Sequence, residues 1–453
     1  MARAKKEAAL TPEERLQAAL VPDWEWPYKL PENWCWTTVG AINQYVGISA
    51  DPTKAKNKTF ELYSVPSSAD NYPEIVLGAD IGSTKQSVKK GDVLLCKINP
   101  RINRVWKVSK YTDHSLLASS EWIVIRNSGL ISNYLMWCFR SPYFRGYMLS
   151  NVSGVGGSLM RAQPKFVQGY PVPVPPLAEQ HRIVDRIESL FAKLDEVKEK
   201  AQAVVDSFET RKAAILHKAF TGELTAKWRE EHGVGMESWE KKSVGELCIS
   251  LKYGTAKKSD ASGNVVVLRM GNLQQGEIDW SDLAYSNDPD DIEKYKLYPG
   301  DVLFNRTNSA ALVGKTAIYR GEHPAIYAGY LIKLDYDHNK IIGDYLNYAL
   351  NTLDAKKYCN SVKTDGVNQS NINAKKIGAY SFNVPSIPEQ EKIVSVIQKL
   401  LSKEQQAKEA AEAVLDQIDL MKKSILACAF RGELGTNDPS EESAVELLKR
   451  TIL

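Results

Sequence analysis

The sequence predicts an α+β protein with two loop-rich, mixed α/β domains separated by two long antiparallel coiled-coil helices, the halves being related by a pseudo-two-fold internal repeat. Three observations predict this architecture. Segments of the first half recur in the second half at a nearly constant offset. Each half contains a long apolar pattern of the heptad type. Elsewhere, short strand-like and helical runs alternate with turn residues.

The repeat is clearest in two shared segments. One reads PPLAEQHRIV at 175–184 and PSIPEQEKIV at 385–394; the other reads KAAILHKAFTGEL at 212–224 and KKSILACAFRGEL at 422–434. The offset is 210 residues in both cases, since 390 − 180 and 432 − 222 give the same number. Weaker matches precede them, at Trp34 and Trp239 and at two GDVL segments. Four matches in one order indicate two copies of a variable domain followed by a shared segment.

Each shared segment predicts one long helix. Apolar residues recur in steps of three and four from 183 to 215, and again from 393 to 425. Gly222 and Gly432 are the expected helix ends. About 42 residues at ~1.5 Å per residue make a rod of roughly 60 Å. Two patterns of equal length are expected to pack on each other; a surface helix on each separate domain is the alternative.

Two charged residues interrupt these apolar patterns, Arg211 in the first copy and Glu404 in the second. In a fully overlapping antiparallel pair they would lie near one layer. An ion pair that sets the register is one interpretation, and a solvated edge of the helix pair is the favoured one.

The patterns divide the chain into domains and connecting segments. Short strands are expected at 93–97, 121–125, 265–269 and 302–305, and helices at 131–140 and 342–353. Thr11, Pro12 and Glu14 form a capping box that begins a helix in the N-terminal extension. The C-terminal tail predicts another short helix, and these two helices are expected to pack together or to contact a partner chain. The predicted segments are 1–27 (N-terminal helical extension), 28–174 (first variable domain), 175–224 (central spacer helix), 225–238 (linker), 239–384 (second variable domain), 385–434 (distal spacer helix) and 435–453 (C-terminal helical tail).

Composition excludes several classes of protein. A formal net charge of +3 means that any nucleic-acid surface must arise from local concentration of Lys and Arg. The six cysteines are scattered without a C-x-x-C pair, so neither a zinc site nor a disulfide framework is expected. No signal peptide and no run of 18 apolar residues is present. We expect a cytoplasmic protein without a membrane association and without a metal.

The loops of the variable domains carry side chains suited to DNA. Arg, Lys, Asn and Gln hydrogen-bond guanine and adenine edges, whereas Ser, Thr and Lys bind phosphate. An ordinary polar loop is the alternative for any single residue, but the pattern occurs in both copies. The candidate DNA-binding residues are Lys97, Asn99, Arg101, Arg104, Ser158, Arg161, Lys165, Arg269, Asn305, Arg306, Asn308, Lys363, Thr364, Asn368, Gln369 and Asn371.

Catalytic motifs are missing. Ser309 replaces the first glycine that a Walker A loop would need before Gly314, and there is no G-x-G-x-x-G segment. The sequence also lacks an Asn-Pro-Pro-aromatic motif, and its six histidines lie far from one another. We therefore expect no catalytic residue in this chain.

The repeated Pro, Glu-Gln, long helix and Gly-Glu-Leu pattern resembles the specificity (S) subunit of type I restriction–modification systems. The resemblance covers about residues 34–448, and its most specific elements are the two Glu-Gln segments and the Thr-Gly-Glu-Leu segment at 221–224. It implies two target-recognition domains at opposite ends of an antiparallel coiled coil. Each domain would recognise one half of a bipartite, asymmetric double-stranded DNA sequence.

The resemblance also implies that the chemistry lies in partner chains. Two modification subunits would carry S-adenosylmethionine and methylate adenine, and restriction motor–nuclease subunits would use ATP and Mg²⁺ to translocate and cleave DNA. No cofactor is then expected in this chain. Two alternatives stay open: a single-chain DNA methyltransferase or nuclease with an unrecognised site, and a structural coiled-coil scaffold.

Overall fold

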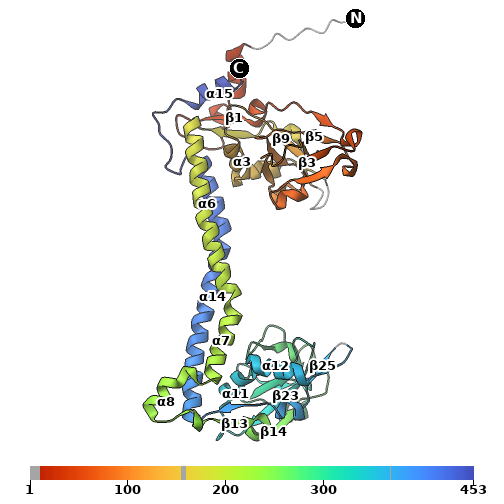
Figure 1. Ribbon diagram of the computed structural model, residues 1–453, viewed down its shortest axis with the longest axis vertical. Coiled ribbons are helices and arrows are strands. Elements are labelled where there is room, and N and C mark those ends of the chain that lie inside the picture. Colours follow the sequence, from red (N-terminus) through yellow and green to blue (C-terminus); the bar gives the residue numbers. More distant parts are fainter. Residues whose placement is uncertain (1–10, 155–159, 368, 453) are drawn as a thin grey trace. The chain divides into compact units, whose positions relative to one another are not determined.

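The computed structural model describes residues 11–154, 160–367 and 369–452. The chain forms two compact units, one of Met1–Lys200 with Ala413–Leu453 and the other of Ala201–Glu412. Helices α6 (Leu177–Asp206) and α14 (Ile387–Phe430) contribute residues to both units (Figure 1). Both units mix helices with short strands, so the predicted α+β class is confirmed.

The first unit is built on two main sheets. The larger has the strand order β2-β5-β8-β3-β4, and the smaller has the order β7-β6-β9; β1 pairs with β12, and β10 with β11. Its strands are β1 (Cys35–Thr38), β2 (Ser49–Ala50), β3 (Thr59–Tyr63), β4 (Glu74–Leu77), β5 (Lys85–Ser87), β6 (Val93–Cys96), β7 (Val105–Lys107), β8 (Ser115–Ala118), β9 (Trp122–Ile125), β10 (Val152–Ser153), β11 (Arg161–Ala162) and β12 (Pro171–Val174). Its remaining helices are α1 (Pro12–Ala19), α2 (Val39–Ile42), α3 (Ser132–Arg140), α4 (Pro142–Ser150), α5 (Pro164–Val167) and α15 (Ala444–Ile452).

The second unit contains a four-stranded sheet, β14-β23-β19-β21, and two three-stranded sheets, β18-β15-β22 and β20-β25-β24; β13 pairs with β26, and β16 with β17. Its strands are β13 (Glu240–Ser243), β14 (Cys248–Tyr253), β15 (Val265–Leu268), β16 (Leu273–Gln274), β17 (Glu277–Ile278), β18 (Tyr285–Ser286), β19 (Val302–Asn305), β20 (Thr307–Asn308), β21 (Thr316–Ile318), β22 (Ala325–Tyr327), β23 (Leu331–Tyr336), β24 (Thr364–Asp365), β25 (Ser370–Asn371) and β26 (Ser381–Val384). Its remaining helices are α7 (Phe208–Phe220), α8 (Ala226–His232), α9 (Val244–Leu247), α10 (Pro289–Lys294), α11 (Gly343–Leu350), α12 (Leu353–Val362) and α13 (Ala374–Gly378).

The four expected strands form within a residue of their predicted limits, as β6, β9, β15 and β19. The single helix expected at 342–353 is wrong, because the chain there forms α11 and then α12. The Thr352 side chain accepts a hydrogen bond from the Ala355 amide, so it caps a new helix where continuation was expected.

The central spacer is also not one continuous helix: it turns at Ser207, between α6 and α7. The Ser207 hydroxyl donates to the carbonyls of Ala203 and Val204, and Arg211 Nη2 donates to the Val204 carbonyl at 3.1 Å. The Val204 carbonyl accepts from both side chains, while the backbone hydrogen bonds from Ser207 to Ala203 and from Arg211 to Ser207 persist, so the interruption is confined to Ser207. The second copy, α14, runs without a break for 44 residues.

Each unit contains an antiparallel helix pair. In the first, Lys422 of α14 binds Asp195 of α6 at 2.5 Å. In the second, Arg211 of α7 binds Glu404 of α14 at 2.5 Å. The favoured interpretation of Arg211 and Glu404 as a solvated edge is therefore wrong: both are about one-third exposed or less, and they form the ion pair. Because this ion pair is partly buried beside the apolar residues that join α7 and α14, it defines the register of the two helices.

The helix ends occur where the glycines predicted them. Gly222 and Gly432 adopt positive φ angles of 82° and 74° immediately after α7 and α14. A side chain at Gly432 would place its Cβ 2.5 Å from Pro31, so this glycine also allows a close approach of the N-terminal segment.

The two terminal helices pack on the first unit. The Thr11 capping box of α1 is present as predicted. Ala19 of α1 and Ala444 and Leu448 of α15 are buried in the same core. The two helices lie side by side, near the label of the C-terminus in Figure 1. Of the two expectations for these segments, packing together is the one observed.

The repeated Glu-Gln motif joins each variable region to its helix. The Gln180 amide accepts a hydrogen bond from the Ile131 backbone N–H at the start of α3 and donates to the Pro175 carbonyl. Gln390 makes the same bonds to Ile342, before α11, and to Pro385. Both glutamines are fully buried. The motif therefore satisfies backbone groups at one helix end and holds the domain against the spacer helix.

The glutamate of the motif binds the segment that follows the other helix of the pair. Glu179 accepts hydrogen bonds from Thr436 at 2.5 Å and Arg182 at 2.9 Å. Glu389 accepts from Thr225 and Arg229, both at 2.7 Å, and from Trp239 Nε1 at 2.9 Å. Burial raises the pKa of Glu179, although the hydrogen bonds from Thr436 and Arg182 act in the opposite direction. Each unit thus has a buried carboxylate that fixes the connection leaving the spacer.

Candidate nucleic-acid interface

In the second unit, a small sheet gathers candidate residues that are far apart in the sequence. Strand β20 pairs with β25, which places Asn308 opposite Ser370, and β25 pairs with β24, which places Thr364 opposite Asn371. The Asn371 amide donates to the Thr307 hydroxyl at 2.8 Å, which ties the two loops together. The candidates Asn308, Thr364 and Asn371 therefore lie on one surface element.

Two further candidates flank this sheet. The Lys363 ammonium donates to the Ala310 carbonyl at 3.0 Å, so it braces the loop after β20 as well as carrying charge. Gln369 is exposed, and its carbonyl accepts from the Gly366 amide at 2.8 Å within the turn between β24 and β25. Polar groups at such a turn are available to a ligand that approaches the sheet.

Arg306 is held beside the same sheet. Its guanidinium lies over the Tyr253 ring at 4.8 Å from the ring centroid, and Nη1 donates to the Gly329 carbonyl at 3.2 Å. Tyr253 and Tyr330 are 41% and 48% exposed, and the Tyr330 carbonyl accepts a hydrogen bond from the Arg306 backbone amide at 3.0 Å. A guanidinium fixed by a ring and a carbonyl is oriented before a ligand binds, which lowers the entropy lost in binding. Neither tyrosine is among the candidates predicted from the sequence, since neither lies in the polar loops that supplied them.

Two other candidates in this unit have internal partners. Asn305 is fully buried; its amide nitrogen donates to the Met270 carbonyl, and its oxygen accepts from the Thr307 amide. It shapes the turn into β20, and its side chain does not reach the surface. Arg269 forms an ion pair with Asp282 at 2.9 Å at the end of β15.

The first unit brings its two candidate loops together in the same manner. Ile98 forms a β-bridge with Arg161, the Lys97 carbonyl accepts from the Ala162 amide at 2.8 Å, and the Asn99 amide donates to Met160. Asn99 adopts a left-handed conformation with φ 49°, which turns the loop. The 97–104 loop therefore lies along the 161–165 segment.

The remaining candidates of the first unit are at or near the surface. Arg161 pairs with Glu121 at 3.3 Å, Lys165 lies over the Phe166 ring, and Arg101 is exposed. Arg104 is half-buried, and its carbonyl accepts from the Cys96 amide. Ser158 and Asn368 lie outside the described residues. Contacts of these candidates with DNA stay predictions.

Replacing Arg306 with Ala should relax recognition at a single base pair. A bidentate contact from arginine to guanine contributes ~1–3 kcal/mol of discrimination against other bases. Competitive binding to double-stranded DNAs substituted at each target position measures this loss. Tyr253→Phe is the matched control, because it keeps the ring under the guanidinium and should leave discrimination unchanged. An equal loss of affinity for every sequence would instead assign Arg306 to a phosphate.

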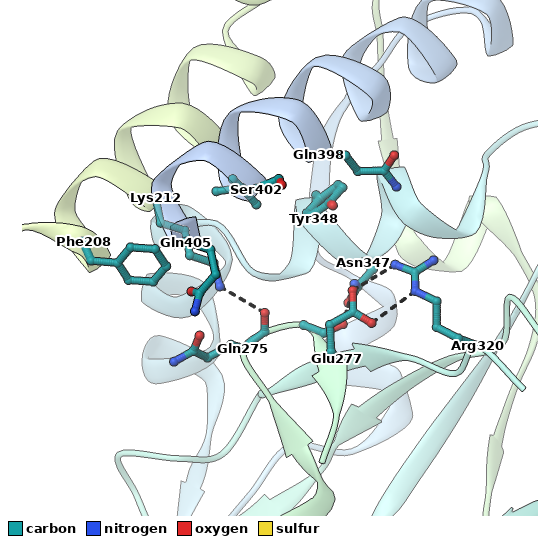
Figure 2. A pocket seen from close by; sticks show the side chains of 12 residues that line it. Phe208, Lys212, Gln275, Glu277, Arg320, Asn347, Tyr348, Gln398, Ser402 and Gln405 are labelled. Atoms are coloured by element: carbon teal, nitrogen blue, oxygen red, sulfur yellow. Dashed lines mark hydrogen bonds and ion pairs between the residues drawn. The ribbon is translucent and has the colours of Figure 1, made fainter. Parts of the chain in front are cut away.

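One cavity of the second unit has charged side chains that are already bound within the protein. Figure 2 shows a cavity of about 430 Å³ between α7, α14 and the β16–β17 turn of the second unit. Its charged side chains have protein partners: Arg320 binds Glu277 at 2.9 Å, and the Lys212 ammonium donates to the Gln275 carbonyl at 3.0 Å. Burial lowers the pKa of Lys212. No histidine or cysteine is among the described residues that line this cavity.

Among the described residues, no group of three or more His, Cys, Asp or Glu side chains is arranged to hold a metal ion. In the described part of the chain, no helix has the length and apolar character needed to cross a membrane.

Comparison with known proteins identifies a family of DNA specificity domains. Residues 236–413 match the family model described as the type I restriction modification DNA specificity domain. The chain is 28% identical over 306 residues to the StySPI specificity subunit of Salmonella potsdam, covering 67% of this chain and 65% of that protein. It is 27% identical over 321 residues to the EcoKI specificity subunit of Escherichia coli K12, covering 69% and 68% respectively. The match thus spans just under two thirds of the Salmonella protein.

Two solved structures share the fold. The HsdS subunit from Thermoanaerobacter tengcongensis superposes with a TM-score of 0.66 at 22% identity, covering 90% of this chain and all of that chain. A chain from a structure described as addressing complex assembly and conformational transition of the type I R-M system gives a TM-score of 0.70 at 22% identity, with the same coverage.

Proposed function

We propose that this chain, which carries a type I restriction modification DNA specificity domain and resembles the specificity subunits of type I restriction enzymes, is the DNA-recognition subunit of such a system. The resemblance predicted from the sequence is confirmed by these comparisons. The subunit binds double-stranded DNA and recognises a bipartite, asymmetric target, one half with each variable domain.

The observation that carries the proposal is a pairing of two candidate loops that occurs in both units. In the first unit Ile98 lies beside Arg161, and in the second Thr307 lies beside Asn371. The two pairs are related by offsets of 209 and 210 residues, the same as the sequence repeat. The scaffold is shared, but the side chains that line it differ, as expected for domains that recognise different half-sites.

The spacer between half-sites is proposed to be an antiparallel coiled coil of α14 with α6 and α7. The antiparallel contacts within each unit, Lys422–Asp195 and Arg211–Glu404, support this arrangement. The equal offset of both shared segments supports two helices of matched length.

The chemistry is proposed to reside in partner chains. Two modification subunits bring S-adenosylmethionine and methylate adenine, and restriction subunits bring ATP, Mg²⁺ and the nuclease. The lack of catalytic motifs in the sequence supports a non-catalytic role for this chain. A single-chain methyltransferase or nuclease would require such motifs, and a pure scaffold would have no need of two dissimilar polar surfaces.

Exchange of residues 28–174 for the corresponding domain of a related subunit tests this function. We expect one half of the methylated sequence to change, because each domain makes its own base contacts. Methylome sequencing of a host carrying the complete operon measures both halves. A change in both halves, or in neither, would contradict the modular interpretation.

The purified chain should neither methylate nor cut DNA. Incubation with labelled S-adenosylmethionine, or with Mg²⁺ and plasmid, measures the two activities. Addition of the modification subunits is the positive control and should restore label transfer. Activity that persists after rigorous removal of partner chains would contradict a non-catalytic role.

A further inference from the structure

The two units differ at one groove beside the spacer helix. In the second unit, a cavity of about 830 Å³ lies between α7, α12 and the β13–β26 pair. Its walls include Phe220, Ala349, Tyr380 and Phe382, and its rim carries charged side chains. The cavity is therefore a large, mainly apolar groove with a polar edge.

The corresponding groove of the first unit is filled by the chain itself. The Tyr28 hydroxyl donates to the Phe430 carbonyl at 2.9 Å. Its ring packs edge-on against Trp36 and Tyr143, with centroid separations of 4.9 and 5.2 Å. The Trp36 indole in turn donates to the Tyr28 carbonyl at 3.2 Å. Tyr28 is thus the anchor of an N-terminal segment that occupies this groove.

The three residues that hold Tyr28 have counterparts in the open groove. Phe430 and Phe220 are the last residues of α14 and α7. The second residue of β1 is Trp36, and the second residue of β13 is Lys241. Each of them pairs with the third residue of the partner strand, which is β12 in the first unit and β26 in the second. The second residue of α4 is Tyr143, and that of α12 is Asp354. Phe220, Lys241 and Asp354 all line the 830 Å³ cavity.

The segment that could fill the second groove is held elsewhere. Pro31 lies against Gly432, and Met236 lies against Gly222. The segments that precede the two variable domains therefore follow the same course at this point. Before it, the second copy forms α8, which Arg229 binds to the buried Glu389 at 2.7 Å. None of the described residues between Gly222 and Glu240 lines the cavity. Among the described residues, none donates a hydrogen bond to the Phe220 carbonyl in the place of Tyr28.

We propose that this groove binds an extended segment of a partner chain, anchored by a tyrosine that occupies the position of Tyr28. The ring packs on Phe220, Tyr380 and Phe382, and the hydroxyl donates to the Phe220 carbonyl. Lys241 and Asp354 replace the two rings that enclose Tyr28, so the segment carries charged residues next to its anchor. Tyr28 of a second copy of this chain is not the anchor, because Phe430 already holds it. The identity of the partner as a modification subunit rests on the proposed function.

Photo-crosslinking tests the occupant. Asp354 is replaced by p-benzoylphenylalanine in the full chain, which is then purified with the modification subunits and irradiated. We expect one intermolecular crosslink, to an extended segment of a modification subunit that contains a tyrosine. The same replacement at Tyr143 is the matched control and should crosslink within the chain, to residues 20–31. An intact complex without the Asp354 crosslink, or a crosslink to a second copy or to this chain's own α8, would overturn the proposal.

A second variant measures the contribution of the groove. Ala214 is exposed on α7 and lines the cavity, so Ala214→Arg should lower affinity for the modification subunit at least ten-fold. Ser424→Arg, at the equivalent position of α14, should leave affinity unchanged because that groove is filled. Equal effects of the two variants would contradict the proposal. Failure of the wild-type complex to form would instead contradict the proposed function, so the two failures are distinguishable.

Discussion

Replacing Glu389 with Ala should destabilise the second unit by about 3–5 kcal/mol, the effect of removing one partner from a buried ion pair. Glu389 is 1% exposed, and the Arg229 side chain that it binds is 9% exposed. Without the carboxylate, the guanidinium keeps its bonds to Thr225 and to the Gly222 carbonyl but loses its counter-charge. The Trp239 indole also loses its acceptor. Each buried group left without a partner adds its own desolvation cost.

Hydrogen exchange of residues 201–412 in the full chain measures this loss, since it reports one unit separately. Glu179→Ala is the matched control. Its partner Arg182 is 37% exposed and retains Glu441 at 2.8 Å, so we expect a smaller loss in the first unit. Combining Glu389→Gln with Arg229→Met should cost less than Glu389→Ala alone, because no unpaired charge remains. Equal losses for Glu179→Ala and Glu389→Ala would refute the buried-charge explanation.

Adding one heptad to each spacer helix should lengthen the unrecognised stretch of the DNA target by about three base pairs. Seven residues extend a helix by ~10.5 Å, and DNA rises ~3.4 Å per base pair. The insertions belong within α6 and within α14, at opposing positions. An insertion after Leu224 would not lengthen the helix, because α7 already ends at Phe220 and Gly222 has left-handed backbone.

Methylation mapping of the double insertion tests whether the length of the spacer helices sets the distance between the two half-sites. The half-site sequences should be unchanged, since no loop has moved within its own domain. A heptad in α6 alone is the control: it mismatches the two helices and should weaken binding without producing one longer spacer. An unchanged number of base pairs between the half-sites in the double insertion would contradict this role of the helices.

Local features of the chain were predictable from the sequence. The capping box at Thr11 and the glycines at 222 and 432 define helix ends through the backbone of a few neighbouring residues. Short apolar runs bounded by turn residues located β6, β9, β15 and β19. The repeated Glu-Gln segments indicated the family, because a contact preserved at a constant offset leaves a recognisable pattern.

The interruptions of the predicted helices could not be predicted from the sequence in the same way. Ser207 and Thr352 are ordinary polar residues, and a heptad or amphipathic pattern continues across each of them. At Ser207 the outcome depends on Arg211, which bonds the Val204 carbonyl and also binds Glu404 of another helix. A contact with a residue almost two hundred positions away in the sequence leaves no trace in a local pattern.

The sequence by itself determined several helix ends and four of the strands, that the chain is built twice, and which loops carry polar side chains, because these properties depend on short-range periodicity and backbone preference. Only the tertiary structure decided which polar residues reach the surface. It buries Asn305 under the turn into β20 and pairs Thr307 with Asn371. It also fills one groove with Tyr28 and leaves its counterpart open. These outcomes depend on the free energy of long-range packing, in which distant segments compete for the same buried contacts.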